Sequence, residues 1–257
     1  MTDSSKILGY GGSAEIDGVQ VLITSGSFGV AGTPSYLEPL SLQPSTDSRS
    51  RVLHADGTAA YTGQVDFDVT EESLVLFTTS KLFQRGYMFD VGIHDGEDGE
   101  LMEDVLVTSI TLSGAAGGLV TASVGFVGPT EAGGSLLVAN EFVRDQVPYG
   151  YWYSGNTDVR DWSLNMNQAA TPVYTNEDVV TPRYIKIGLF DFSLQVTTYE
   201  QLRAHDAISI ATSTFTLKGN TTAEGFSFTG VTDLGTYVHS FETAAAFSIG
   251  SGDTIIS

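Results

Sequence analysis

The sequence predicts a mainly β protein with two tandem antiparallel β-barrel or β-sandwich domains, each carrying a short flanking helix. Three observations lead to this fold class: strand-forming segments dominate the chain, helix signals are few, and one order of features recurs in both halves. The 257 residues are enough for one large domain or for two of about 125 residues each. A hydrophobic content of 41% allows a buried core without metal or disulfide links.

The strand-forming segments are rich in β-branched and aromatic residues. They occur at residues 19–23, 105–112, 184–187 and 226–229. Residues 65–69 and 190–194 alternate apolar side chains with polar or small ones, and this period of two leaves one face buried and one face wet. Such alternation is typical of antiparallel sheets. The glycine-rich residues 114–118 predict a hairpin turn between two strands.

Helix signals fall in two matched places. In residues 70–77, Thr70 has the position of an N-cap and acidic residues follow it in the first turn. In residues 197–202, Thr197 and Glu200 have the spacing of a capping box. Each segment follows an alternating strand, so each predicts a short helix beside a sheet.

The matched helices belong to a longer internal repeat. A Thr-Pro pair followed by Tyr occurs at residues 33–36 and again at 171–174, and a polar loop follows both. A glycine-led alternating strand then begins at Gly63 in one half and at Gly188 in the other. The Pro/Gly-rich residues 128–134 separate the halves. The predicted domains are therefore residues 1–132 and 133–257.

The net charge of the chain argues against a nucleic-acid-binding function. The formal net charge is −20, and the 11 basic residues are spread singly along the chain. A protein that grips nucleic acid needs clustered Lys and Arg to displace counterions from phosphates, so this chain is expected to repel nucleic acid. The acidity either keeps a β-rich protein soluble or forms a surface that nucleic acid passes without sticking.

The N-terminal residues and the apolar segments indicate where in the cell the protein is expected. No signal peptide is visible at the N-terminus, and no apolar run approaches the roughly 20 residues that span a bilayer. There is no Cys, which excludes disulfides and thiolate metal sites. We expect a protein made in a cytoplasm with no membrane partner.

No set of residues in the sequence predicts an enzyme, a cofactor site or a metal site. The four histidines lack metal-ligand spacing; they are His54, His94, His205 and His239. No G-x-S-x-G nucleophile motif occurs. Asp66, Asp68 and Glu71 have the residue type of a glycosidase carboxylate pair. They also fit the wet face of an amphipathic strand that leads into a helix, which is the interpretation we favour.

Two further segments leave alternatives open. Four carboxylates with two glycines lie close together; they are Asp95, Glu97, Asp98 and Glu100. They could wrap Ca²⁺ or form a solvated hairpin tip, and the spacing is not that of a helix-loop-helix calcium site. The aromatic residues 149–153 and Trp162 could form a sugar-stacking platform. The other interpretation, which we favour, is a core or a subunit interface.

Residues 159–168 with 171–174 resemble the opening of tail tube proteins of long-tailed bacteriophages. There, an alternating strand with Ser and Asn at polar positions runs into a proline-containing segment. Residues 187–194, a Gly-led strand rich in Phe, and the predicted helix at 197–202 are similar to the sequel in that family. Residues 112–126 resemble the closing hairpin of a first copy. The resemblance covers most of residues 149–205 and, more weakly, residues 19–128.

The resemblance implies a structural virion protein assembled in the host bacterial cytoplasm. Tail tube subunits are small β domains with an outer helix, and six such domains usually form a ring. A chain with two copies would therefore form a trimeric, pseudo-hexameric ring with a formal charge of about −60, three times −20. Its partners would be further copies and other tail proteins, with DNA passing through unbound. A baseplate ring, a tail-terminal ring or a capsid decoration protein is the alternative, followed by a carbohydrate-binding module.

Site residues follow from this resemblance. The carboxylates expected to face the channel are Asp66, Asp68 and Asp191, which would repel the phosphates of DNA. The carboxylates expected to reach the next ring are Asp95, Glu97, Asp98 and Glu100. There they would meet a basic side chain such as Arg183 or Lys186.

Overall fold

The computed structural model of the chain is mainly β. It describes residues 13–37, 53–70, 72–78, 82–94, 99–116, 118–128, 153–154, 159–175, 182–200, 207–211, 216–220, 226–231, 235–242 and 247–250. The strands in the first half are β1 (Ser13–Ile16), β2 (Val19–Leu37), β3 (Leu53–Asp68), β4 (Met88–His94), β5 (Gly99–Ala115) and β6 (Thr121–Gly128). Those in the second half are β7 (Tyr153–Ser154), β8 (Val159–Val173), β9 (Tyr184–Thr198), β10 (Ala207–Ala211), β11 (Thr216–Asn220), β12 (Phe226–Val231), β13 (Tyr237–Phe241) and β14 (Phe247–Gly250).

Six strands of the first half close into a barrel. Their order is β5-β4-β1-β2-β3-β6, and the pairing of β6 with β5 completes the circuit. All these pairings are antiparallel. The interior is filled by fully buried side chains, which include Ile16, Val65, Phe67, Ile110 and Phe126. The predicted alternation of residues 65–69 is confirmed, because Val65, Phe67 and Val69 all point into this core.

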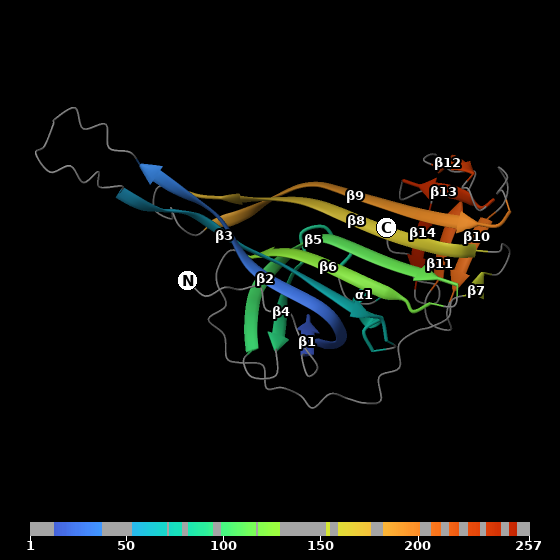
Figure 1. The fold of residues 1–257 in the computed structure, drawn as a ribbon, viewed down its shortest axis with the longest axis horizontal. Helices are drawn as coiled ribbons and strands as arrows, with labels where there is room; N and C mark the ends of the chain where they lie inside the picture. Colours follow the sequence, from blue (N-terminus) through green and yellow to red (C-terminus); the bar gives the residue numbers. More distant parts are fainter. Residues whose placement is uncertain are drawn as a thin grey trace, which may run out of the picture.

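The long strand β5 connects the barrel to the rest of the sheet. One of its edges pairs with β6, and the other is shared between β4 and β8 (Figure 1). Residues 109–115 of β5 pair with residues 161–167 of β8. A continuous antiparallel sheet therefore runs in the order β2-β3-β6-β5-β8-β9-β13-β12. The predicted turn between two strands is confirmed at a slightly later position: β5 continues to Ala115 and β6 begins at Thr121.

Two hairpins extend past the barrel in the same direction, β2–β3 and β8–β9 (Figure 1). Near the base of these arms, Ile185 and Ile187 of β9 pack on a small apolar cluster of Ala60, Leu106 and Val127. A second sheet, β14-β11-β10-β7, lies beside the opposite ends of β8 and β9.

The predicted flanking helices are largely replaced by turns and strand. The Thr70 hydroxyl accepts a hydrogen bond from the Ser73 N–H over 3.1 Å, as an N-cap does, but the helix α1 that follows covers only Val75–Thr78. The helix expected from Thr197 is not confirmed. Thr197 and Thr198 end β9, where β-branched side chains favour extended backbone and both residues are buried. Residues 201–206 lie outside the described residues.

The predicted boundary at residues 132 and 133 also lies outside the described residues, so the division into two domains stays a prediction. The β5–β8 pairing shows that the two predicted halves share one sheet. Within the part of the chain that the structure describes, no helix has the length and hydropathy needed to cross a membrane.

Candidate functional site

The most distinctive surface of the molecule is one face of the continuous sheet. Three rows of directly paired residues cross this face from strand to strand. The first row is Ser25, Asp66, Ser123, Thr111, Asn165 and Ser193. The second row is Leu22, Asp68, Thr121, Ser113, Ser163, Gln195, Ser240 and Ser227. The third row is Ser27, Gln64, Gly125, Ser109, Asn167 and Asp191.

We call these three rows the polar face. Apart from Leu22 and Gly125, every member carries a hydroxyl, an amide or a carboxylate, and none is Lys, Arg or His. Paired residues in adjacent strands project to the same side of a sheet, so the rows form one continuous surface. At the β5–β8 pairing the polar face continues from the first half of the chain to the second, and its residues are polar on both sides of that pairing.

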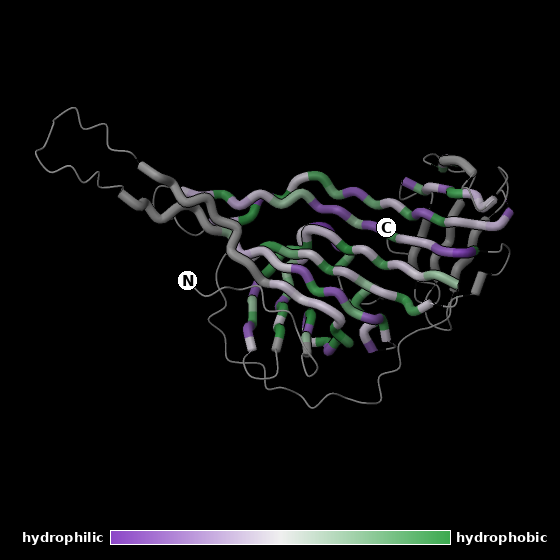
Figure 2. Tube along the Cα trace, in the orientation of Figure 1, coloured by the Kyte–Doolittle hydropathy of each residue, from purple (hydrophilic) through white to green (hydrophobic). Residues whose placement is uncertain are grey.

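The opposite face of the same strands is apolar and buried. Leu112, Val124, Leu164 and Val196 all have a relative exposure of 0%. Figure 2 shows the resulting alternation of hydrophilic and hydrophobic residues along the strands. The period-two sequence therefore produces both the core and the polar face, because each strand contributes every second residue to each side.

Asp66 is held by a cluster of hydrogen bonds on this face. The Ser25 hydroxyl donates to one carboxylate oxygen over 2.5 Å, and the Gln64 amide donates to the other over 2.8 Å. Burial raises the pKa of Asp66, but hydrogen bonds from Ser123, Ser25 and Gln64 outweigh burial and hold the pKa below its usual value. Asp66 is therefore a fixed negative charge at neutral pH.

Asp68, two residues along β3, has a different environment. Partial burial raises the pKa of its carboxyl above the usual value. Asp191 is exposed, at the β9 end of the third row, where it pairs with Asn167. The structure thus places all three predicted channel-facing carboxylates on the polar face, although it does not bring them into one cluster.

Uncharged groups on the polar face bond mainly to one another. The hydroxyls of Ser113 and Thr121 lie 3.0 Å apart. The Thr111 hydroxyl donates to the Asn165 side chain over 3.1 Å, and the Asn165 amide donates to Ser163 over 3.2 Å. These five hydroxyl and amide side chains are therefore partly satisfied within the protein.

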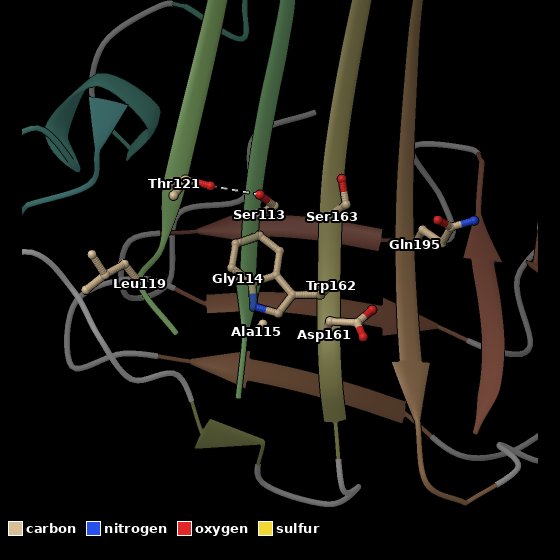
Figure 3. Close-up of a pocket in the computed structure, with 9 residues that line it drawn as sticks. All are labelled: Ser113, Gly114, Ala115, Leu119, Thr121, Asp161, Trp162, Ser163 and Gln195. Atoms are coloured by element: carbon tan, nitrogen blue, oxygen red, sulfur yellow. Dashed lines mark hydrogen bonds between the residues drawn. The ribbon is translucent and has the colours of Figure 1, made fainter. Parts of the chain in front are cut away.

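A hollow of about 360 Å³ lies where β5, β6, β8 and β9 come together (Figure 3). Polar-face residues Ser113, Thr121 and Ser163 line it, together with the ring of Trp162. The indole lies across Gly114, where an added Cβ would approach it to 2.8 Å. Only glycine at this position lets Trp162 pack at the junction between the first and second halves of the chain.

This packing decides between the two interpretations of Trp162. Its relative exposure is 4%, so its ring is not available as a sugar-stacking platform. Within the predicted platform at residues 149–153, the structure describes Tyr153 alone, in β7. Trp162 is a core residue at the β5–β8 junction, as the favoured interpretation expected.

The predicted inter-ring carboxylates are only partly described. Asp95, Glu97 and Asp98 lie outside the described residues, while Glu100 is exposed near the start of β5. Arg183 and Lys186, the basic residues proposed to meet this segment, are exposed at the start of β9. In the portion of the chain with described structure, no group of three or more His, Asp or Glu side chains could hold a metal ion.

Sequence reasoning missed most of the polar face. It singled out the carboxylates but not the Ser, Thr and Asn residues of β5, β6 and β8 that join them into rows. The available signal was the alternation of small polar with apolar residues in 109–113, 121–125 and 163–167. What the sequence alone could not supply was the register that aligns these segments side by side.

In comparisons with known proteins, the chain matches no protein-family model and no curated protein. The carboxylates of the polar face are spread over two strands, with Asp66 and Asp68 on β3 and Asp191 on β9.

Proposed function

We propose that this chain is a structural protein of the phage tail tube type, which forms rings around a channel for DNA. Copies made in the bacterial cytoplasm would assemble into the tail of the virion. The observation that carries this proposal is the polar face: a continuous polar surface with three carboxylates and without a basic side chain in any of its three rows. DNA carries one negative charge for about every 1.7 Å of its axis, so the carboxylates of such a surface repel it and no side chain of the three rows attracts it.

The order of the strands supports two tandem domains. In the first half, the hairpins β2–β3 and β5–β6 give the sheet order β2-β3-β6-β5. In the second half, the hairpins β8–β9 and β12–β13 give β8-β9-β13-β12. Each half contributes one long hairpin and one shorter hairpin, arranged in the same way. The β5–β8 pairing is then the junction between two repeated units.

The two outer strands of the sheet support assembly with further copies. Among the described residues, β12 pairs only with β13, and β2 beyond Val21 pairs only with β3. An unpaired strand edge is a template for another strand, and closing a ring removes both edges. Three copies would bring three sheets of eight strands together, or 24 strands in all, around one channel.

Electrostatics supports turning the polar face toward that channel. Three copies would place nine carboxylates there from Asp66, Asp68 and Asp191 alone, within a ring of formal charge about −60. At physiological salt the Debye length is about 8 Å, so these charges act on DNA that passes close to the wall. The result is a wall along which DNA slides without binding.

Electron microscopy of the concentrated protein, with native mass measured alongside, tests the proposal. We expect hollow rings or tubes with threefold or pseudo-sixfold symmetry and a unit of about 82 kDa, three times 27.3 kDa. A protein that remains a monomer at millimolar concentration, also when mixed with preformed phage tail initiator complexes, would contradict it. A finite assembly without a channel would instead favour a capsid decoration protein.

A further inference from the structure

His239 is the one histidine whose side chain the structure describes, and it is completely buried in β13. Its ring stacks on Phe226 of β12, with ring centres 5.9 Å apart and an angle of 15° between the planes. Phe228 of the same strand lies 5.7 Å away at 43°. On the other side of β13, His239 pairs with Val196 of β9. An imidazole thus occupies a core position between the β12–β13 hairpin and the remainder of the sheet.

The hydrogen bonds of Thr198 define the tautomer of this imidazole. The Thr198 hydroxyl donates its only hydrogen to the Glu200 carbonyl oxygen. The same hydroxyl oxygen lies 3.2 Å from Nε2 of His239, so it must accept, and Nε2 must carry the proton. Nδ1 then presents a lone pair, and it is buried with no hydrogen-bond partner among the described residues. In the neutral ring, Nε2–H therefore donates one hydrogen bond to Thr198, and the lone pair of Nδ1 accepts none from any residue of the described structure.

Among the residues that the structure describes, none accepts a hydrogen bond from a second proton on this ring. That proton would bind at Nδ1, and the side chains that contact the ring from β12, Phe226 and Phe228, and its paired residue on β9, Val196, are all apolar. The titratable residues on β13 and just after it are Tyr237 and the exposed Glu242, those that follow Thr198 of β9 are the exposed Tyr199 and Glu200, and β12 has none. None of these side chains is a hydrogen-bond partner of Nδ1. Burial accordingly lowers the pKa of His239. A buried imidazolium without a carboxylate is disfavoured, whereas an imidazolium in water is not.

We propose that His239 makes the pairing of the β12–β13 hairpin with β9 sensitive to pH. The neutral ring stabilises the paired hairpin, and protonation favours its detachment from β9. Opening of the hairpin exposes the ring, which then takes a proton at Nδ1 and cannot return to its site without losing it. Lower pH therefore favours the open hairpin. Because β12 is the end strand of the sheet, release changes the availability of that edge. The inference concerns the single chain and does not depend on ring assembly.

Hydrogen exchange of the full-length protein at pH 7.5 and pH 5.5 tests this proposal, with protection factors corrected for intrinsic rates. An exposed histidine has a pKa of about 6.5, so the opening equilibrium of residues 226–241 should rise over this interval, by up to about tenfold if the buried ring stays neutral throughout. Amides of β3 and β6 should change far less. The variant His239→Leu, which keeps an apolar side chain of similar size, should remove the pH dependence. His54→Leu, the matched control, should keep it.

Two results would overturn the proposal. One is an equal pH dependence of residues 226–241 in His239→Leu, which would assign it to other groups. The other comes from nuclear magnetic resonance of the wild-type protein and needs no variant: a His239 ring that titrates in the folded state at or above about 6.5 is not held neutral by its site. Titration below that value, together with greater opening of residues 226–241 at pH 5.5 than at pH 7.5, is the expected outcome.

Discussion

The sheet sections β2-β3-β6-β5 and β8-β9-β13-β12 share a strand order and a polar face, but they differ on the buried side. In the first section the buried positions of β3 and β6 are uniformly apolar; they are Val65, Phe67, Ala122, Val124 and Phe126. In the second section, Leu194, Val196 and Phe241 share the buried side with Thr198 and His239. The first section is also closed into a barrel by β1 and β4.

This difference indicates that the choice of residue is more restricted on the polar face of the sheet than on its buried side. A core needs only apolar volume and good packing, and it can admit a polar residue that finds a partner. The polar face, in contrast, keeps the same absence of basic side chains across both sections. We infer that the face is set by what it contacts and the core by what each section can pack. The two sections should then differ in stability and in response to pH.

The largest effect is expected in the barrel core. Phe126 is 1% exposed and meets Phe89 edge-on, with ring centres 6.4 Å apart. Phe126→Ala should lower the free energy of unfolding by about 3–5 kcal/mol, measured by urea denaturation. Phe228→Ala on the outer strand β12, where the side chain is 43% exposed, is the matched control and should cost below about 1 kcal/mol. Similar losses for both variants would mean that the barrel is no more stable than the outer strand.

A smaller loss is expected at the junction between the sections. A Cβ at Gly114 would lie 2.8 Å from Trp162, so Gly114→Ala should cost about 1–3 kcal/mol by overpacking. Gly118→Ala is the control, because its Cβ would meet Ala115 only at 3.5 Å, an ordinary contact distance. Thermal unfolding of both variants measures the difference. An unchanged melting temperature for Gly114→Ala would show that the two sections are not tightly packed at β5–β8.

The smallest effects are expected on the polar face, with opposite signs for neighbouring carboxylates. The pKa of Asp66 is lowered in the folded state, so its charge stabilises the fold above the unfolded value of 3.8, and this contribution is lost as pH falls through the folded pKa. The pKa of Asp68 is raised, so its charge costs stability at neutral pH and this cost disappears in acid.

Asn variants separate these two contributions. Asp66→Asn should destabilise by about 1 kcal/mol or less at pH 7, since the site is largely solvated, and the loss should shrink toward pH 3. Asp68→Asn should be neutral or slightly stabilising at pH 7. Denaturation midpoints from pH 3 to pH 7 measure both. Equal losses for the two variants at pH 7 would mean that the hydrogen bonds of Asp66 have no effect on stability.

The sequence predicted where strands lie and which of their residues are buried better than it predicted which strands pair. The alternation of residues 65–69 correctly assigned Val65 and Phe67 to a core and Asp66 to the wet face. It could not show that β5 divides one edge between β4 and β8, because pairing partners are determined by contacts far apart in the chain. The helix expected at Thr197 failed for a related reason. Pairing with β8 and β13 outweighed the local capping signal.

The candidate site was predicted in the same partial way. The structure places Asp66, Asp68 and Asp191 on the same face of the sheet, and their orientation toward a channel stays a prediction. The burial of His239 had no local signal, since its partners Phe226 and Thr198 come from two other strands.

The central claim is that the polar face lines a channel, and a charge-matched exchange tests it most directly. In assembled rings, we would replace Asp66, Asp68 and Asp191 with Lys and measure how much linear duplex DNA is retained and protected from nuclease. The control replaces Glu72, Glu103 and Glu242, three exposed carboxylates outside the three rows, so both variants carry the same net charge.

We predict that the polar-face variant retains protected DNA at low salt and releases it at high salt, because lysines in the channel would bind phosphates. The control and the wild-type rings should protect none. Equal protection by the two variants, or none by the polar-face variant in intact rings, would contradict the claim that this face lines the channel.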